Sequence, residues 1–187
     1  MDGQRTSLAH RLPIVFSPLE GSAMAREGTL DVEPMDEGTR RAVEETVARI
    51  DQSWTGLVKV IDGIPAERLE EPGVSGEWSV KDLIAHVAFW DAQAVEKIHR
   101  RAAGEPVRAV DWQAMNDREA AASRSRSLDD LRAELHQAHR QLLDVLGTLP
   151  PTDPMTADVC SFVPDDTYEH YDEHVAEIRV WRERVGV

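Results

Sequence analysis

Apolar side chains recur at intervals of three and four residues along most of this chain, and this spacing limits what it can fold into. A period near 3.6 places such residues on one face of an α-helix. No alternating apolar and polar pattern of useful length is present, so nothing in the sequence is typical of a β-strand. The clearest periodic run consists of Leu128, Leu131, Leu135, Ala138, Leu142, Val145 and Leu149. We therefore predict an all-α fold.

The periodic stretches predict four helical regions, over residues 36–62, 80–102, 111–149 and 165–184. The third region is either one bent helix or two helices in series. Ser79 with Asp82 and Ser127 with Asp130 are typical of capped helix N-termini. The connections 64–78 and 150–164 are long and contain several prolines and glycines, which allows crossovers. This pattern predicts a four-helix bundle that need not follow a simple up-down-up-down order.

Residues 1–35 differ from the rest of the chain. They contain scattered prolines and glycines and show no sustained period. We interpret them as an irregular N-terminal extension, flexible or loosely docked. Because Met24 and Met35 are alternative start positions, the segment is also open to interpretation as a start-site artefact. The predicted bundle domain then spans residues 36–187.

The charge balance argues against several classes of partner. The 35 acidic residues outnumber the 21 basic ones, which gives a net charge of −14, and there is no long basic run. Binding to nucleic acid or to an anionic membrane surface relies on basic patches, so neither is expected. The single cysteine, Cys160, excludes an internal disulfide and a four-cysteine zinc site. No membrane span or signal peptide is evident, and we predict a cytoplasmic protein.

Three histidines suggest a metal site. His170 and His174 are four residues apart, so a helix places them on one face, one turn apart. On spacing alone, a metal-binding pair and a half-exposed pair are equally good interpretations. His86 lies between the core positions Leu83 and Trp90, where a hydrogen-bonded core histidine is the simpler interpretation. Together, however, the three would supply three ligands and leave an open position, as in catalytic zinc sites.

Other histidine patterns are weaker. The run from His170 to His174 matches the zinc-peptidase pattern H-x-x-E-H, but only thirteen residues follow it, which leaves little room for a distant third ligand. Glu96 and His99 give one Glu-x-x-His pair, whereas a di-iron bundle needs two such pairs and two further glutamates. We interpret the three remaining histidines of the predicted bundle as solvated: His99, His136 and His139.

Two segments resemble a known family, the DinB-like four-helix bundles. The stretch from Trp78 to Trp90 resembles its second-helix signature, and the stretch from His170 to Arg179 resembles its fourth-helix signature. Residues 111–116 are similar to the ClbS/DfsB branch. The resemblance implies an up-down-down-up bundle, often dimeric. It also implies a divalent ion, often zinc or nickel, on the positions that match His86, His170 and His174.

Relatives in that family include thiol-dependent isomerases and transferases, and proteins that inactivate a reactive genotoxin. We therefore expect a metal-dependent protein acting on a small molecule, as a hydrolase or as a thiol-dependent transferase or isomerase. The alternatives are a non-catalytic binding or self-protection protein and a purely structural, dimerising bundle. The candidate bases, for which a solvated acidic helix start is the preferred interpretation, are Asp166, Glu169 and Glu173. The candidate pocket residues are Trp78, Trp112 and Asn116.

Overall fold

The computed structural model describes residues 37–106, 109–150 and 154–187, and the predicted extension over residues 1–35 lies outside them. These residues form helices and no β-strand. The prediction of an all-α fold is confirmed. The helices are α1 (Glu37–Asp62), a short 3₁₀ turn (Ala66–Arg68), α2 (Val80–Ala102), α3 (Trp112–Ser123), α4 (Leu128–Gly147), α5 (Pro154–Asp166) and α6 (Tyr168–Val185).

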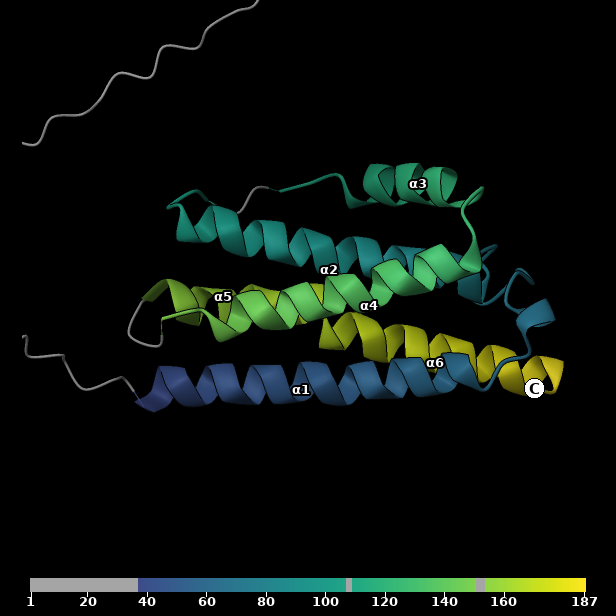
Figure 1. Cartoon of the computed structure of the whole chain (residues 1–187), viewed down its shortest axis with the longest axis horizontal. Coiled ribbons are helices and arrows are strands. Elements are labelled where there is room, and N and C mark those ends of the chain that lie inside the picture. The colour runs from purple at the N-terminus through teal and green to yellow at the C-terminus, as the bar shows by residue number, and fades with distance from the viewer. Residues whose placement is uncertain (1–36, 107–108, 151–153) are drawn as a thin grey trace, which may run out of the picture. The chain divides into compact units, whose positions relative to one another are not determined.

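Four of these helices make the bundle, and they run in the order up, down, down, up. Figure 1 shows α2 returning antiparallel to α1, then α4 running in the direction of α2, and α6 running in the direction of α1. Helix α2 packs along α4, and α1 packs along α6. The parallel arrangement of α2 and α4 requires a crossover, and α3, which lies on the outer side of α2, forms part of it. The predicted third region is therefore two separate helices.

The capping signals in the sequence act as predicted. The Ser79 hydroxyl accepts a hydrogen bond from the Asp82 amide, while the Asp82 carboxylate accepts one from the Ser79 amide. The Ser127 hydroxyl likewise accepts from the Asp130 amide. These bonds satisfy amide groups that have no partner within the helix. The largest fully buried side chains come from the apolar faces of the bundle helices and include Ile50, Leu57, Leu83, Ile98, Leu131, Leu142, Ile178 and Trp181.

The prediction of a long connection over residues 150–164 is wrong, because α5 occupies most of that segment. Pro154 stands at the first helical position, where a missing amide proton costs nothing. Pro164 lies in the last turn, and Val159 and Val163 bury one face of the helix. Asp165 and Asp166 consequently end α5, instead of beginning the last helix as predicted, and α6 starts after Thr167.

The prediction that His139 is solvated is also wrong, because the residue is buried. Its ring stacks on Trp54 of α1 with the centroids 3.8 Å apart and the planes 3° from parallel. Only 5% of His139 is exposed. The apolar repeat of α4 assigned this position to the flank of the core, but the wide indole of Trp54 extends the core to it. His136 and His99 are exposed, as predicted.

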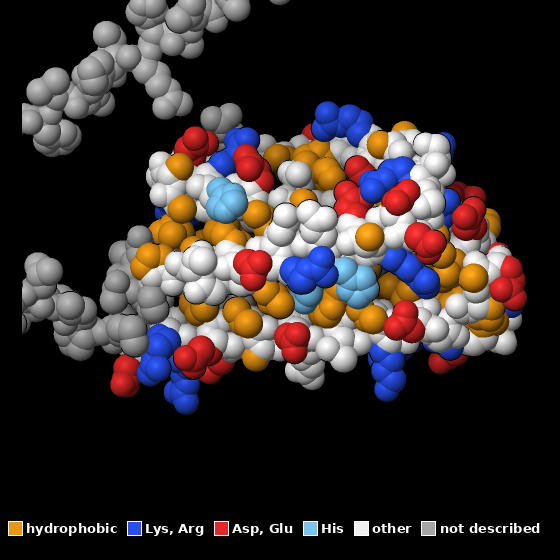
Figure 2. Space-filling model, in the orientation of Figure 1, with side chains coloured by type: hydrophobic (Ala, Val, Ile, Leu, Met, Phe, Trp, Pro, Cys, Tyr) orange, Lys and Arg blue, Asp and Glu red, His pale blue; other side chains and the backbone are white. Residues whose placement is uncertain are grey.

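Figure 2 shows the distribution of charged side chains on one face of the molecule. Acidic and basic side chains are interspersed there among hydrophobic ones, with no broad cluster of lysine and arginine. Within the described segments, no helix is both long enough and apolar enough to cross a bilayer.

Candidate metal centre

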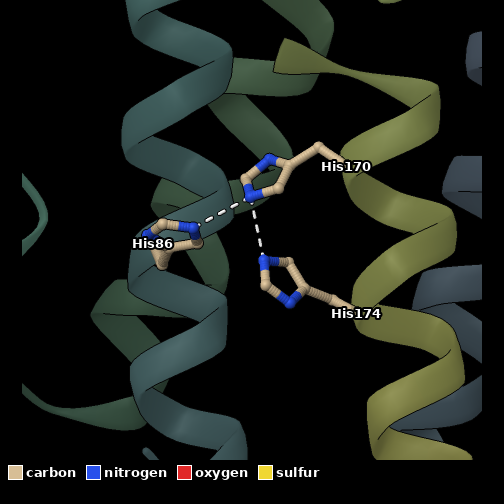
Figure 3. Close-up of side chains that lie close together, drawn as sticks. All are labelled: His86, His170 and His174. Carbon is tan, nitrogen blue, oxygen red and sulfur yellow. Dashed lines mark hydrogen bonds between the residues drawn. The ribbon is translucent and has the colours of Figure 1, made fainter. Parts of the chain in front are cut away.

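The three predicted histidines meet between α2 and α6. Figure 3 shows His86 from α2 pointing toward His170 and His174 from α6. The Nε2 atom of His170 lies 2.8 Å from Nε2 of His86 and 2.8 Å from Nε2 of His174. In the described part of the chain, these are the residues that form a group able to hold a metal ion. The spacing argument therefore identified side chains that come together in the fold.

A buried hydrogen bond joins the two helices that carry the histidines. The Tyr171 hydroxyl donates to the Asp91 carboxyl group over 2.5 Å, and both residues are fully buried. Asp91 belongs to α2 and Tyr171 lies between the two histidines of α6. Burial raises the pKa of Asp91 well above its usual value, which favours its uncharged form. The bond fixes α2 against α6 and thereby sets the position of His86 relative to His170 and His174.

Burial also sets the protonation state of the imidazoles. It lowers the pKa of His86 to about 3 and that of His170 to about 2, with the neighbouring histidines adding to the shift. Both rings are therefore neutral near pH 7. A metal ion needs the lone pair of a neutral imidazole, so these two groups need lose no proton to bind one.

The close contacts fit a shared cation better than a set of hydrogen bonds. Two contacts of 2.8 Å converge on Nε2 of His170, and a single imidazole proton can point well at only one partner. The Nδ1 atom of His86 is buried without a hydrogen-bond partner among the described residues. Nitrogens bound to one ion at about 2.0–2.1 Å would lie somewhat farther apart than these two contacts, and all three candidate ligand atoms already lie within 4.8 Å of one another. The three residues therefore fit a divalent ion.

Glu177 orients the third imidazole. Its carboxylate lies 2.7 Å from Nδ1 of His174, and its other oxygen accepts a hydrogen bond from the Ser75 hydroxyl, also at 2.7 Å. A carboxylate at Nδ1 favours a proton on that atom, which leaves the Nε2 lone pair of His174 facing the cluster. Glu177 was missed at the sequence level, although its place three residues after His174 put it on the same helix face.

We predict that Glu177→Ala weakens binding of a divalent ion about 10–100-fold, the usual cost of losing the group that orients a metal-binding histidine. Glu177→Gln keeps an acceptor for Nδ1 and should recover part of the affinity. Competition with a chromophoric chelator measures both values. Glu183→Ala, an exposed change on the same helix, is the control. Equal affinities for wild type and Glu177→Ala would show that Glu177 does not position His174.

An open pocket of about 470 Å³ lies over the cluster. Its walls include all three predicted pocket residues, Trp78, Trp112 and Asn116. Asn116 also accepts a hydrogen bond of 2.9 Å from the indole nitrogen of Trp90, which fastens α3 to α2 at the pocket edge. A volume of this size suits a small molecule. Trp90 and Gln113 also line the pocket, although no sequence pattern identified them as pocket residues.

The three candidate bases occupy different surroundings. Glu173 is exposed and lines the pocket, whereas Glu169 is exposed and lies outside the pocket lining. Asp166 lines the pocket but is buried, so its interpretation as part of a solvated helix start is wrong. Its carboxylate pairs with Lys97 at 2.5 Å, and burial raises its pKa.

Comparison with known families assigns the chain. The model of the family described as mycothiol maleylpyruvate isomerase N-terminal domain matches residues 50–159, which is more than half of the sequence. The chain belongs to this family. The mycothiol maleylpyruvate isomerase N-terminal domain family is part of the DinB-like superfamily, in agreement with the bundle described above. The matched region contains His86 and ends before His170 and His174. The case for His170 and His174 as metal ligands therefore rests on their geometry and not on the family match.

A solved structure shares the fold of this family member. It is the crystal structure of an uncharacterised protein from Escherichia coli UTI89, with a TM-score of 0.64 and 19% sequence identity. The superposition covers 78% of this chain and 95% of that one. At this identity the likeness concerns the fold alone. A search of curated proteins found no match.

Proposed function

We propose that this protein is a divalent-metal-dependent enzyme that acts on a small molecule. Its reaction is either a thiol-dependent transfer or isomerisation, or a hydrolysis. The observation that carries the proposal is the convergence of three Nε2 atoms at the base of an open pocket. Membership of a family named for a thiol-dependent isomerase supports the thiol-dependent form of the reaction. Within the superfamily, the helix opening at residues 111–116 favours the ClbS/DfsB branch.

His86, His170 and His174 would hold the ion, and zinc or nickel suits three imidazole ligands. Such an ion lowers the pKa of a water or thiol at its open position and so supplies a nucleophile near neutral pH. Glu173 is an exposed carboxylate of the pocket that has no ion pair within the described residues and lies next to His174 on α6, and we assign it the role of proton acceptor. Asp166 is held by Lys97 and is better suited to fixing the end of α5.

The test is a reaction screen with metal-loaded protein. Conjugation of N-acetylcysteine to 1-chloro-2,4-dinitrobenzene reports thiol transfer, and p-nitrophenyl acetate reports hydrolysis. We expect turnover above background in at least one assay, lost in the His170→Ala/His174→Ala double variant and retained in His99→Ala. Equal turnover in wild type and double variant would contradict the proposal. Retained ligand binding without turnover would favour a non-catalytic protein that sequesters a reactive metabolite.

A further inference from the structure

The pocket over the histidine cluster is both acidic and aromatic. Its lining contains three carboxylates and three indole rings, and among its described lining residues there is no lysine or arginine. The carboxylates are those of Asp165, Asp166 and Glu173, and the indoles are those of Trp78, Trp90 and Trp112. A pocket built to bind an anionic substrate through its side chains would be expected to present a cation. The charge of this lining favours a different class of ligand.

Two of the three carboxylates are left to act on a ligand. Lys97 neutralises Asp166 over 2.5 Å. Asp165 and Glu173 are exposed, and neither forms an ion pair with another described residue. Their two negative charges match the two positive charges of a divalent ion on neutral imidazoles. An anionic head group at that ion, such as a thiolate, then leaves one negative charge in excess, which a positive group on the same ligand would balance.

The indole rings suit a positive group as well. Trp112 is 60% exposed and lines the pocket, so its indole ring is accessible to a ligand there. Indole faces attract ammonium groups. The chain already uses this attraction nearby, because the Lys97 ammonium lies 5.3 Å from the centre of the Trp90 ring. Trp78 packs edge-on against His86, with ring centroids 4.8 Å apart, so an indole borders the metal-ligand candidates directly.

We propose that this pocket selects small molecules that carry a positively charged amine or quaternary ammonium group beside an anionic head group, and that Asp165, Glu173 and Trp112 determine this preference. The inference rests on the proposed function, because the head group is assigned to the ion held by the histidines. It adds the charge class of the substrate, which neither the family match nor the histidine geometry supplies.

The test compares three thiols of similar size on zinc-loaded protein at low salt. Thiocholine is cationic, 3,3-dimethylbutane-1-thiol is its neutral isostere, and 3-mercaptopropionate is anionic. Each dissociation constant is measured by calorimetry for wild type and for Asp165→Asn/Glu173→Gln, after the zinc content of both has been matched. The control is Asp172→Asn/Glu183→Gln, which makes the same change in net charge on exposed positions of α6 outside the pocket lining. For each thiol, the dissociation constant of a variant is compared with that of wild type, which removes the influence of the thiol's own acidity.

We expect the pocket variant to bind thiocholine about tenfold or more weakly than wild type, to bind the neutral thiol within about twofold, and to bind 3-mercaptopropionate more tightly. The control variant should differ little for all three. Equal changes for the three thiols, or for pocket and control variants, would overturn the charge preference and leave the proposed function standing. If zinc-loaded wild type binds none of the thiols, the assigned head-group position fails and the inference fails with it.

Discussion

A His86→Ala variant is expected to bind a divalent ion at least about 100-fold more weakly than wild type, since the roughly 10–16 kcal/mol of a four-ligand zinc site corresponds to about 3 kcal/mol per ligand. His86 is the ligand candidate that α2 contributes, and it closes the cluster against α6. Without it, His170 and His174 offer only the two ligands of an i, i+4 pair. Titration of cobalt or zinc against a competing chelator measures the loss.

The control for this variant is His99→Ala, which removes an exposed histidine from the same helix. The metal-free His86→Ala protein should keep the helical circular dichroism of wild type, because Nδ1 of His86 has no hydrogen-bond partner to lose and its Nε2 contact competes with that of His174. A His86→Ala protein that is folded and binds metal as tightly as wild type would show that His86 is a core histidine and not a ligand.

Replacing His139 by phenylalanine is expected to protect the protein against acid. Burial lowers the pKa of His139 to about 4 in the folded protein, against 6.5 when unfolded. Between these values the unfolded chain binds the proton and the folded chain does not, so the free energy of unfolding falls as the pH drops through this window. Phenylalanine keeps a ring on Trp54 and takes up no proton. The free energy of unfolding of His139→Phe, relative to that of wild type, should therefore rise by about 2 kcal/mol between pH 7 and pH 5.

Urea denaturation of metal-free wild type and His139→Phe at pH 7 and pH 5 measures this difference. The comparison cancels the contributions of other buried groups, among them Asp91 and Asp166, whose pKa values are raised and which act in the opposite direction. His99→Phe is the matched change at an exposed position. A pH-independent difference between His139→Phe and wild type would mean that His139 takes up its proton as readily when folded as when unfolded.

The bundle was predictable because its signals are local. The apolar repeat of α4 and the capping pairs at Ser79 and Ser127 each involve residues within a few positions of one another, and the helices begin where these pairs predict. Helix α5 was missed because Pro154 and Pro164 resemble a loop in sequence. Pro154 stands in the first turn, where a helix tolerates proline, whereas Pro164 lies inside the helix near its end, and only the packing of Val159 and Val163 reveals the helix.

The candidate site, too, was predictable only where its signals are local in sequence. The pair His170 and His174 follows from helical spacing, and His86 follows from its place between two core positions. The stacking of His139 on Trp54, the pairing of Asp166 with Lys97 and the bond from Ser75 to Glu177 all join residues from different parts of the chain. Composition and periodicity carry no information on such contacts, so the buried state of His139 and Asp166 could not be predicted.

The central claim is that His86, His170 and His174 bind one divalent ion, and metal content tests it most directly. Protein purified without a histidine tag is analysed by mass spectrometry for zinc, nickel, iron and manganese, beside the His170→Ala/His174→Ala variant. We predict about one ion per chain in wild type and none in the variant. Wild-type protein that holds no metal, and takes up none when zinc or nickel is added, would contradict the account.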